Sequence, residues 1–193
     1  MTAPASPLID PDVALQRLLA AASAISETET LPLSSALGRV LAQEVRSTID
    51  VPPADNTAMD GYALRSGDVS AAGICLPVSQ RIPAGAVPQP LQPGTAARIF
   101  TGGLIPPGAD AVVMQEQCAA EGDAVRINAP PKAGDWVRRR GLDVAAGNVV
   151  LAAGQRLRPQ DLGLAASVGV ASLRVRRKPR VAMLFTGDEL AMP

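Results

Sequence analysis

The sequence predicts an α+β fold in which a β-rich segment interrupts a helix-containing one. Three observations support this prediction. Apolar residues recur at helical spacing near both ends of the chain, over about residues 11–26 and 159–169. Between about residues 50 and 145, prolines and glycines separate short runs that contain Val and Ile, which is typical of a module with many turns. A short apolar run at Val181–Phe185 is typical of a strand buried on both faces.

The first helix is predicted over about residues 11–26. Asp10 supplies a capping carboxylate, and Pro11 stands at the first helical position, where proline is favoured. The apolar side chains that follow at helical spacing are Leu15, Leu18, Leu19, Ala22 and Ile25. A second, shorter helix is predicted to begin at Ser34 or Ser35, with Leu37, Val40 and Leu41 on one face.

Extended structure is predicted from Glu44 to Ile49, where the chain enters the β-rich segment. The short runs that predict strands there include Ala97–Phe100, Ala111–Met114 and Ala124–Ile127. Pro159 then begins a helix that ends near Gly169, and a strand is predicted from Ser172 to Val175.

Helical segments on both sides of the β-rich segment predict a nested arrangement. Residues 1–46 and 147–178 would form a discontinuous first domain, with residues 47–146 inserted as a β-rich domain. Residues 179–193 would open a separate α/β domain, because a parallel strand needs a crossover and a neighbouring strand. We therefore expect this sequence to be the front portion of a longer protein.

Composition argues against several classes of protein. The 193 residues include no histidine, which removes the usual general base and the commonest metal ligand. The two cysteines, Cys75 and Cys118, form no C-x-x-C motif, which argues against a Cys/His zinc site and favours a reducing cytoplasm. Aromatic residues make up only 2%, so we expect no base-stacking nucleic-acid site. No apolar run approaches the roughly 18 residues needed to span a membrane.

Charge is distributed unevenly although the formal net charge is zero. Residues 1–60 carry three basic and eight acidic side chains, a balance of −5, and residues 61–193 carry fifteen and ten, a balance of +5. Sixteen of the 18 basic residues are arginine, whose flat fork suits phosphate and other oxyanions. Biased codon usage is an equally good explanation of that total.

A dense polar segment, Asp55–Ala63, is the first candidate for function. It follows Pro52-Pro53 and has no amphipathic period of either kind, so it is predicted to be a shaped loop. Such loops commonly carry function on a rigid scaffold. Its candidate side chains are Asp55, Asn56, Thr57 and Asp60.

Two further segments place polar groups directly after predicted strands. Thr101-Gly102-Gly103 would leave a hydroxyl and bare backbone N–H groups that suit an oxyanion. Thr186-Gly187-Asp188-Glu189 follows the last predicted strand, at the kind of sheet edge where α/β proteins bind ligands.

Each segment also has an ordinary structural explanation. Thr101-Gly102-Gly103 could be a β-turn, Asp60-Gly61 is a common hairpin signal, and Thr186–Glu189 could be a helix cap. The basic run Arg138–Arg140 is commonly a solvated face, and the one at 176–180 could be a linker. The co-occurrence of these segments is what favours function.

These segments together resemble the molybdopterin molybdenumtransferase family, the MoeA and gephyrin E-domain group. The matching stretches are Pro52–Ala63, Arg98–Glu116, Arg139–Asp143 and Gln155–Leu190, in family order. The resemblance implies an elongated first domain interrupted by a β-rich second one. A three-layer α/β molybdopterin-binding domain, of which this chain would hold only the first strand and loop, would follow. Phe100 stands where the family often has Met or another aliphatic residue.

The resemblance also implies an activity, the insertion of molybdate into adenylated molybdopterin with release of AMP and use of Mg²⁺. By matching motif positions, Asp60, Thr101, Asp143 and Glu189 would be catalytic. Asp60 and Glu189 would also hold the metal. The residues that would bind substrate are Asp55, Asn56, Thr57, Gly102, Arg138, Thr186, Gly187 and Asp188.

The expected partners follow from the same resemblance. The full-length protein would be a cytoplasmic homodimer with its site shared between subunits, so the 193-residue chain alone is predicted to be inactive. Molybdopterin adenylyltransferase and proteins that mature molybdenum enzymes would be further partners, with neither nucleic acid nor membrane among them. Two alternatives remain open at this point: a scaffold that binds other proteins, and a truncated non-catalytic paralogue that binds molybdopterin.

Overall fold

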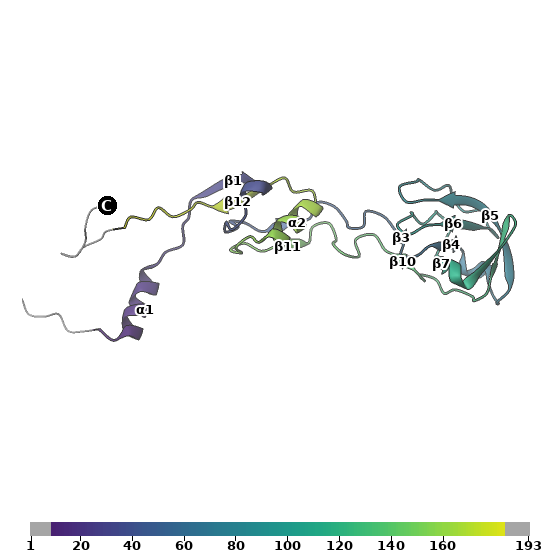
Figure 1. Ribbon diagram of the computed structural model, residues 1–193, viewed down its shortest axis with the longest axis horizontal. Helices are drawn as coiled ribbons and strands as arrows, with labels where there is room; N and C mark the ends of the chain where they lie inside the picture. Colours follow the sequence, from purple (N-terminus) through teal and green to yellow (C-terminus); the bar gives the residue numbers. More distant parts are fainter. Residues whose placement is uncertain (1–8, 184–193) are drawn as a thin grey trace, which may run out of the picture.

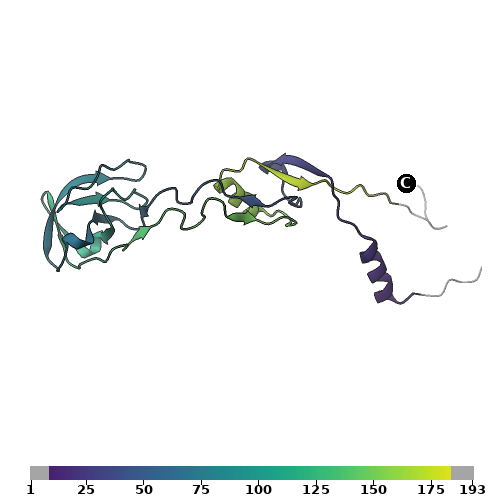
Figure 2. The same cartoon turned by 180° about the vertical axis from the view of Figure 1, so that it is seen from behind.

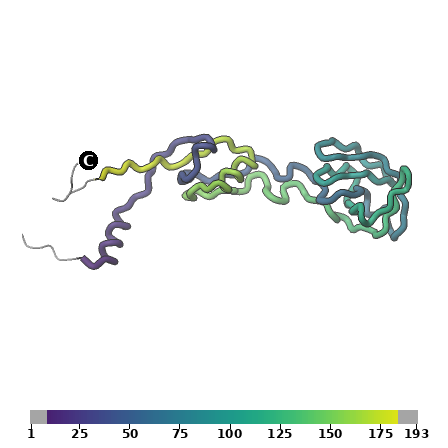
Figure 3. The backbone as a smooth tube through the Cα atoms, viewed as in Figure 1, coloured from purple at the N-terminus to yellow at the C-terminus, as the bar shows by residue number. Residues whose placement is uncertain are grey.

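The computed structural model describes residues 9–183 as an elongated chain with two lobes (Figure 1). We call residues 28–46 with 148–176 the proximal lobe, and residues 56–138 the β-rich lobe. Residues 47–55 and 139–147 are the two connectors, which run side by side between the lobes (Figure 3). Each lobe has its own buried apolar core.

Helix α1, Pro11–Ala21, stands apart from both lobes in opposite views (Figures 1 and 2). Asp10 caps it as expected, because its Oδ1 accepts the N–H of Asp12 at 2.9 Å. The helix ends five residues earlier than predicted, and none of its residues is buried. The residues that the structure describes therefore leave its apolar face uncovered, with Leu18 70% exposed.

The proximal lobe is built from two parts of the chain that lie far apart in sequence. Strand β1, Thr28–Pro32, pairs antiparallel with β12, Ser172–Arg176. Strand β2, Val45–Arg46, pairs in the same way with β11, Val149–Leu151, and helix α2, Pro159–Ser167, packs against β11. The core side chains include Leu41, Leu157 and Val175, each at most 1% exposed.

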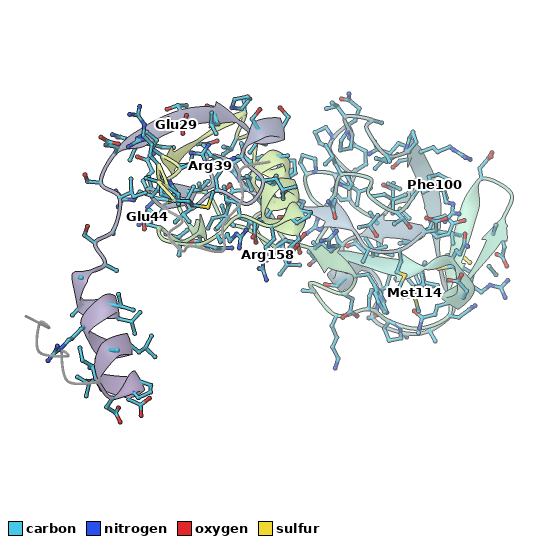
Figure 4. All side chains as sticks on the ribbon, turned by 60° about the vertical axis from the view of Figure 1, so that its left-hand side comes forward. Glu29, Arg39, Glu44, Phe100, Met114 and Arg158 are labelled. Atoms are coloured by element: carbon cyan, nitrogen blue, oxygen red, sulfur yellow. The ribbon has the colours of Figure 1, made fainter. Side chains whose placement is uncertain are left out.

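An ion pair ties this lobe together. The Arg39 side chain is only 9% exposed, and its Nη2 donates to Glu29 Oε1 at 2.5 Å and to the Arg176 carbonyl oxygen at 2.7 Å. Figure 4 shows Glu29 and Arg39 in the proximal lobe, with Phe100 and Met114 in the β-rich lobe. Arg39 thus joins the early and late parts of the chain.

The β-rich lobe contains a six-stranded sheet in the order β7-β4-β6-β5-β9-β8. Its pairings are antiparallel except between β5 and β6, which run parallel. The strands are β4 (Gly61–Leu64), β5 (Ile74–Ile82), β6 (Ala96–Ile99), β7 (Ala111–Met114), β8 (Cys118–Glu121) and β9 (Ala124–Ile127). A separate two-stranded pair joins β3, Asn56–Thr57, to β10, Val137–Arg138.

Alternation along the strands gives this sheet two apolar faces. Tyr62, Leu64 and Val113 belong to one buried cluster, and their neighbours Ala63 and Val112 belong to the other. Both faces are thus covered at β4, which explains why all four of its residues are buried.

The predicted class is confirmed in its coarse form, a mixed chain of mostly strands with few helices. The strands at 97–100, 111–114, 124–127 and 172–175 are confirmed within one residue at either end. The helix that begins at Pro159 is also confirmed, and it ends at Ser167, two residues before the predicted end near Gly169. Strands β1 and β5 were not predicted. The domain boundaries at 46/47, 146/147 and 178/179 stay a prediction.

The second predicted helix is wrong. The structure has only a 3₁₀ turn at Leu33–Ser35, and a second turn at Leu37 and Gly38 leads to isolated β-bridges at Val40 and Leu41. Leu41 donates its N–H to the Gln155 carbonyl oxygen at 2.8 Å, and Val40 and Leu41 form β-bridges with Arg156 and Val175. Backbone pairing with the late part of the chain therefore overrides the helical spacing of the apolar side chains.

Two other predictions need correction. The segment Asp55–Ala63 is only partly a loop, because β3 and the first three residues of β4 lie within it. The predicted strand Val181–Phe185 is not formed at residues 181–183, where Val181 is 75% exposed and pairs with none of the residues described. A two-sided strand needs neighbours, and the described chain provides none there; residues 184 and 185 lie outside the described range.

Among residues 9–183, no helix is both long enough and apolar enough to cross a lipid bilayer.

Candidate functional site

Asp60 lies just before β4 and is held by one partner residue, Thr101. Its Oδ1 accepts the Thr101 backbone N–H at 2.7 Å and the Thr101 hydroxyl at 2.7 Å. These two bonds lower the pKa of Asp60, the backbone one most, and the nearby charge of Arg98 acts in the same direction. Asp60 Oδ2 accepts no hydrogen bond from the described residues, so the site presents one oriented, ionised carboxylate oxygen.

The backbone N–H groups of the Thr101-Gly102-Gly103 turn are not bare, contrary to the prediction. Gly102 donates to the Thr57 carbonyl oxygen at 2.9 Å and Gly103 to the Phe100 carbonyl oxygen at 2.7 Å. Since Thr101 donates to Asp60, all three N–H groups are already satisfied. The turn therefore positions Asp60 rather than forming an oxyanion nest.

Thr57 and Asn56 come from the same short strand, β3, but differ in their surroundings. The Thr57 side chain is 1% exposed, and its hydroxyl donates to the Met59 carbonyl oxygen at 2.8 Å and accepts the Met59 N–H at 3.1 Å. Thr57 thus shapes the turn that leads to Asp60. Asn56 Oδ1 is buried and has no hydrogen-bond partner among the described residues, which marks it as a free acceptor within the site.

The remaining described candidates lie in or beside the connectors, and each is paired. Arg138 Nη2 donates to Asp143 Oδ2 at 2.6 Å. Asp55 accepts the Arg140 backbone N–H at 2.8 Å and Arg139 Nη1 at 2.6 Å. The pKa of Asp55 is lowered chiefly by the backbone N–H of Arg140 and further by Arg139.

These residues come from three neighbouring segments. In the β3–β10 pair Asn56 is opposite Arg138, and on its other side Asn56 forms a bridge with Leu104. The Ile105 N–H donates to the Asp55 carbonyl oxygen at 3.0 Å. The structure therefore brings together the segments that carry Asp55–Asp60, Thr101–Gly102 and Arg138, with Asp143 joined through its ion pair. Thr186, Gly187, Asp188 and Glu189 lie outside the described residues.

Sequence reasoning missed Arg98. Its Nη1 donates to the Gly61 carbonyl oxygen at 3.0 Å and its Nη2 to Gln115 Oε1 at 2.6 Å. Its guanidinium lies over the Tyr62 ring, 5.1 Å from the centroid, and the Phe100 ring, 4.6 Å from the centroid. The usable signal was strand alternation in the predicted strand Ala97–Phe100. Arg98 is opposite Tyr62, and Tyr62 follows Asp60 by two residues.

The described side chains do not by themselves form a magnesium site. Within residues 9–183, no group of three or more His, Cys, Asp or Glu side chains gathers in a way that could hold a metal ion. Asp60 Oδ2 is one available carboxylate oxygen, whereas Asp143 and Asp55 are engaged by arginines. Of the predicted ligand pair Asp60 and Glu189, only Asp60 lies within this range.

Comparison with known proteins shows similarity along most of the chain. The family described as "MoeA N-terminal region (domain I and II)" matches residues 9–169. A molybdopterin molybdenumtransferase of a Nostoc species is 45% identical over 169 residues, covering 85% of this chain and 39% of that protein. The molybdopterin molybdenumtransferase 2 of Mycobacterium tuberculosis is 44% identical over 183 residues, covering 92% of this chain and 45% of that protein.

Solved structures give the same result for the fold. The crystal structure of a molybdopterin biosynthesis MoeA protein from Pyrococcus horikoshii OT3 matches 90% of this chain and 47% of its own, with a TM-score of 0.85 and 39% identity. The chain thus spans about two fifths of the length of the first two curated relatives and about half of this solved one.

Proposed function

The chain belongs to the family of MoeA N-terminal regions, and from this premise we propose that it is part of a molybdopterin molybdenumtransferase. The whole protein would insert molybdate into adenylated molybdopterin and release AMP, in the biosynthesis of molybdenum cofactor. In this proposal, the proximal lobe belongs to an elongated first domain and the β-rich lobe is the inserted second domain.

The observation that carries this proposal is the Asp60–Thr101 pair. The two residues come from two separate predicted motifs, 41 positions apart, and meet through two hydrogen bonds of 2.7 Å. These bonds to Oδ1 fix the orientation of the carboxylate, so Oδ2 is held in one direction and is available to a ligand. The lowered pKa keeps Asp60 ionised at neutral pH, so it would act as a hydrogen-bond acceptor or charge partner rather than as an acid.

The other proposed residues would orient the anionic substrate. Arg138 is half-exposed and its ion pair with Asp143 holds its guanidinium next to β3, so it would bind a substrate oxyanion while Asp143 positions it. The buried Oδ1 of Asn56 would accept a hydrogen bond from a substrate donor. Asp55 would hold Arg139 and the second connector in place.

Asp60, Glu189 and substrate phosphate oxygens would be the ligands of the predicted Mg²⁺. A magnesium site commonly uses only one or two carboxylates with substrate phosphates, so a single described carboxylate is compatible with it. When bound, the ion would neutralise phosphate charge. The shared dimeric site, the adenylyltransferase and maturation partners and the cytoplasmic location stay predictions on the same footing.

The test is the molybdate-dependent release of AMP from adenylated molybdopterin by the longer protein that contains this chain. We expect Asp60→Asn to lower the rate at least about 100-fold, because the substitution keeps the shape but removes the charge. Asp68→Asn is the matched control, because Asp68 in the same lobe also accepts a backbone N–H, from Gly94 at 2.9 Å.

Two outcomes would count against parts of this proposal. Unimpaired AMP release by the Asp60→Asn protein would remove Asp60 from the site. AMP release by the 193-residue chain alone would contradict the expectation that this chain is inactive by itself.

A further inference from the structure

A cavity of about 440 Å³ lies over one face of the six-stranded sheet, beside the candidate site. Its sheet side is lined by Tyr62 of β4, Arg98 of β6 and residues 78–81 of β5. Its opposite side is the turn between β8 and β9, with Gly122 and Asp123. None of the residues so far proposed for the site, other than the newly found Arg98, lines this cavity.

The strand register explains why two arginines meet there. Arg98 is opposite Tyr62 in the antiparallel β4–β6 pair and opposite Arg81 in the parallel β5–β6 pair. Opposite residues share a face of the sheet, so all three side chains project from the same side. Phe100, two positions beyond Arg98, has both guanidinium groups over its ring, at 4.5 Å for Arg81 and 4.6 Å for Arg98.

Arg81 is the available cation of this pair. Among the described residues it makes no hydrogen bond and no ion pair, and its contact is the stacking on Phe100. By contrast, Arg39, Arg98 and Arg177, which also line cavities, each donate at least one hydrogen bond. Two guanidinium groups lie 4.5 and 4.6 Å from the centre of one ring, so positive charge is concentrated at this end of the cavity and would stabilise a bound anion.

The acidic groups near the cavity do not neutralise Arg81. Asp60 is hydrogen-bonded to Thr101 and lies near Arg98. Glu121 belongs to the β8–β9 hairpin and is paired with Arg126. Asp123 lines the opposite wall and makes no side-chain hydrogen bond to the described residues. The cavity therefore has a cationic wall on the sheet and an anionic group on the hairpin turn.

We propose that this cavity binds a tetrahedral oxyanion of the phosphate type, free or as the phosphate group of a larger molecule, through the guanidinium of Arg81. The stacking on Phe100 orients the planar fork, which then donates charge-assisted hydrogen bonds to two oxygens of the anion. Arg98 adds charge but keeps its bonds to Gly61 and Gln115. This proposal does not depend on the proposed transferase activity.

The experiment is a titration of the 193-residue chain with orthophosphate, molybdate and AMP at low ionic strength. Binding is monitored by calorimetry and by changes in amide NMR shifts. We expect saturable binding with shifts at residues 78–81 and 120–124. Arg81→Gln should weaken binding at least tenfold, and Arg81→Lys less. Arg65→Gln is the matched control, because Arg65 is exposed, unpaired among the described residues and outside the cavity.

The Asp123→Asn variant distinguishes a free anion from a phosphate ester. Tighter binding of orthophosphate and molybdate in this variant would assign the cavity to free oxyanions, because a repelling charge has been removed. Weaker binding of AMP would show that a larger molecule donates a hydrogen bond to Asp123 while its phosphate contacts Arg81. Both results support the cavity as the site.

Three results would overturn the proposal. The first is that none of the three anions binds saturably to the wild-type chain below about 10 mM. The second is equal weakening by Arg81→Gln and Arg65→Gln, which would indicate non-specific charge attraction. The third is binding that Asp123→Asn leaves unchanged for every anion, with shifts elsewhere.

Discussion

At the scale of the residue, Asp60 combines two properties that the sequence motif alone does not distinguish. One carboxylate oxygen has a structural task, because it accepts both the N–H and the hydroxyl of Thr101 and so closes the Thr101-Gly102-Gly103 turn. The other oxygen is available to a ligand. The turn glycines serve this arrangement by bonding to Thr57 and Phe100, not by binding an anion themselves.

The first prediction concerns the pKa of Asp60. Thr101→Val removes the hydroxyl donor but keeps the backbone N–H, which is the larger cause of the lowered pKa. We expect the pKa of Asp60 to rise toward its ordinary value without reaching it, as measured by a carboxyl-carbon NMR titration. A pKa that does not move would mean that the hydroxyl is not a partner in solution.

The second prediction concerns Gly61, which follows Asp60. A Cβ at this position would lie 2.0 Å from the Val113 carbonyl oxygen and 2.9 Å from the Val113 carbonyl carbon. Both are backbone atoms of the paired strand β7, so they cannot move aside. We expect Gly61→Ala to lower the free energy of unfolding of the β-rich lobe by about 3 kcal/mol or more in urea denaturation.

Gly67→Ala is the control for this measurement, because an added Cβ there meets no atom within 4 Å. Equal stability of the Gly61→Ala and wild-type proteins would show that β4 and β7 are not paired in this register. The glycine of the Asp-Gly pair is thus needed for close strand packing, an interpretation that the hairpin signal in the sequence did not include.

At the scale of the element, the two connectors form a ladder of ion pairs and backbone bonds. Asp50 accepts the Ala146 N–H at 2.8 Å and Arg140 Nε at 2.6 Å, and Val51 and Val144 exchange two backbone hydrogen bonds. Asp55 and Arg139 continue the ladder toward β3. Charged groups that look like a solvated basic run in the sequence therefore hold two antiparallel segments together.

The third prediction concerns the pH dependence of this ladder. The pKa of Asp50 is lowered, first by the Ala146 N–H and then by Arg140, and the pKa of Asp55 is also lowered. A depressed carboxyl pKa stabilises the folded form above the unfolded value of about 3.9 and ceases to do so as the pH falls through the folded value. We expect the connectors to loosen only below about pH 4.

The amide NMR shifts of Ala146 and Arg140 measure this transition, because both N–H groups donate to these carboxylates. Their pH midpoints should lie below 3.9, the ordinary value for aspartate, and Asp50→Asn should abolish the Ala146 transition. Midpoints at or above that value would contradict the ladder. The side chains of Arg139 and Arg140 are largely exposed, so salt should weaken these pairs.

At the scale of the whole molecule, the connectors join the proximal lobe to the β-rich lobe, and within residues 9–183 each lobe has its own core. The proximal core and the two clusters of the β-rich lobe share no residue. Figure 1 shows the lobes separated along the long axis. Such lobes are expected to unfold as separate cooperative units.

The fourth prediction uses one core substitution in each lobe. Leu41→Ala in the proximal lobe and Ile127→Ala in the β-rich lobe both remove a side chain that is 0% exposed. Each should lower the free energy of unfolding of its own lobe by about 2–5 kcal/mol. In calorimetry, each should lower the midpoint temperature of one of two transitions and leave the other unchanged. A single transition that both variants lower equally would show that the lobes fold as one unit.

Helix α1 is the element whose apolar face the described chain does not bury. Its capping and spacing predict a helix, and a helix forms, yet its apolar side chains are exposed. Local sequence is enough to start a helix, because the cap and the proline act within one turn. It does not determine what covers the apolar face.

The sequence by itself determined the elements whose signals are local. The helices that begin at Pro11 and Pro159 and the strands at 111–114 and 124–127 were found from nearby residues. Their signals are capping and strand composition, which do not require knowledge of distant contacts. The roles of Asp60 and Thr101, which rest on the family resemblance, stay a prediction.

Only the tertiary structure decided which distant groups meet. It replaced the predicted helix around Leu41 with a turn and isolated β-bridges, satisfied the N–H groups of the Thr101 turn, and placed Arg81 and Arg98 on one ring. These outcomes depend on pairings between residues far apart in the chain, such as Leu41 with Gln155. Because buried backbone groups must find partners wherever the fold supplies them, long-range pairing overrode the local pattern at these positions.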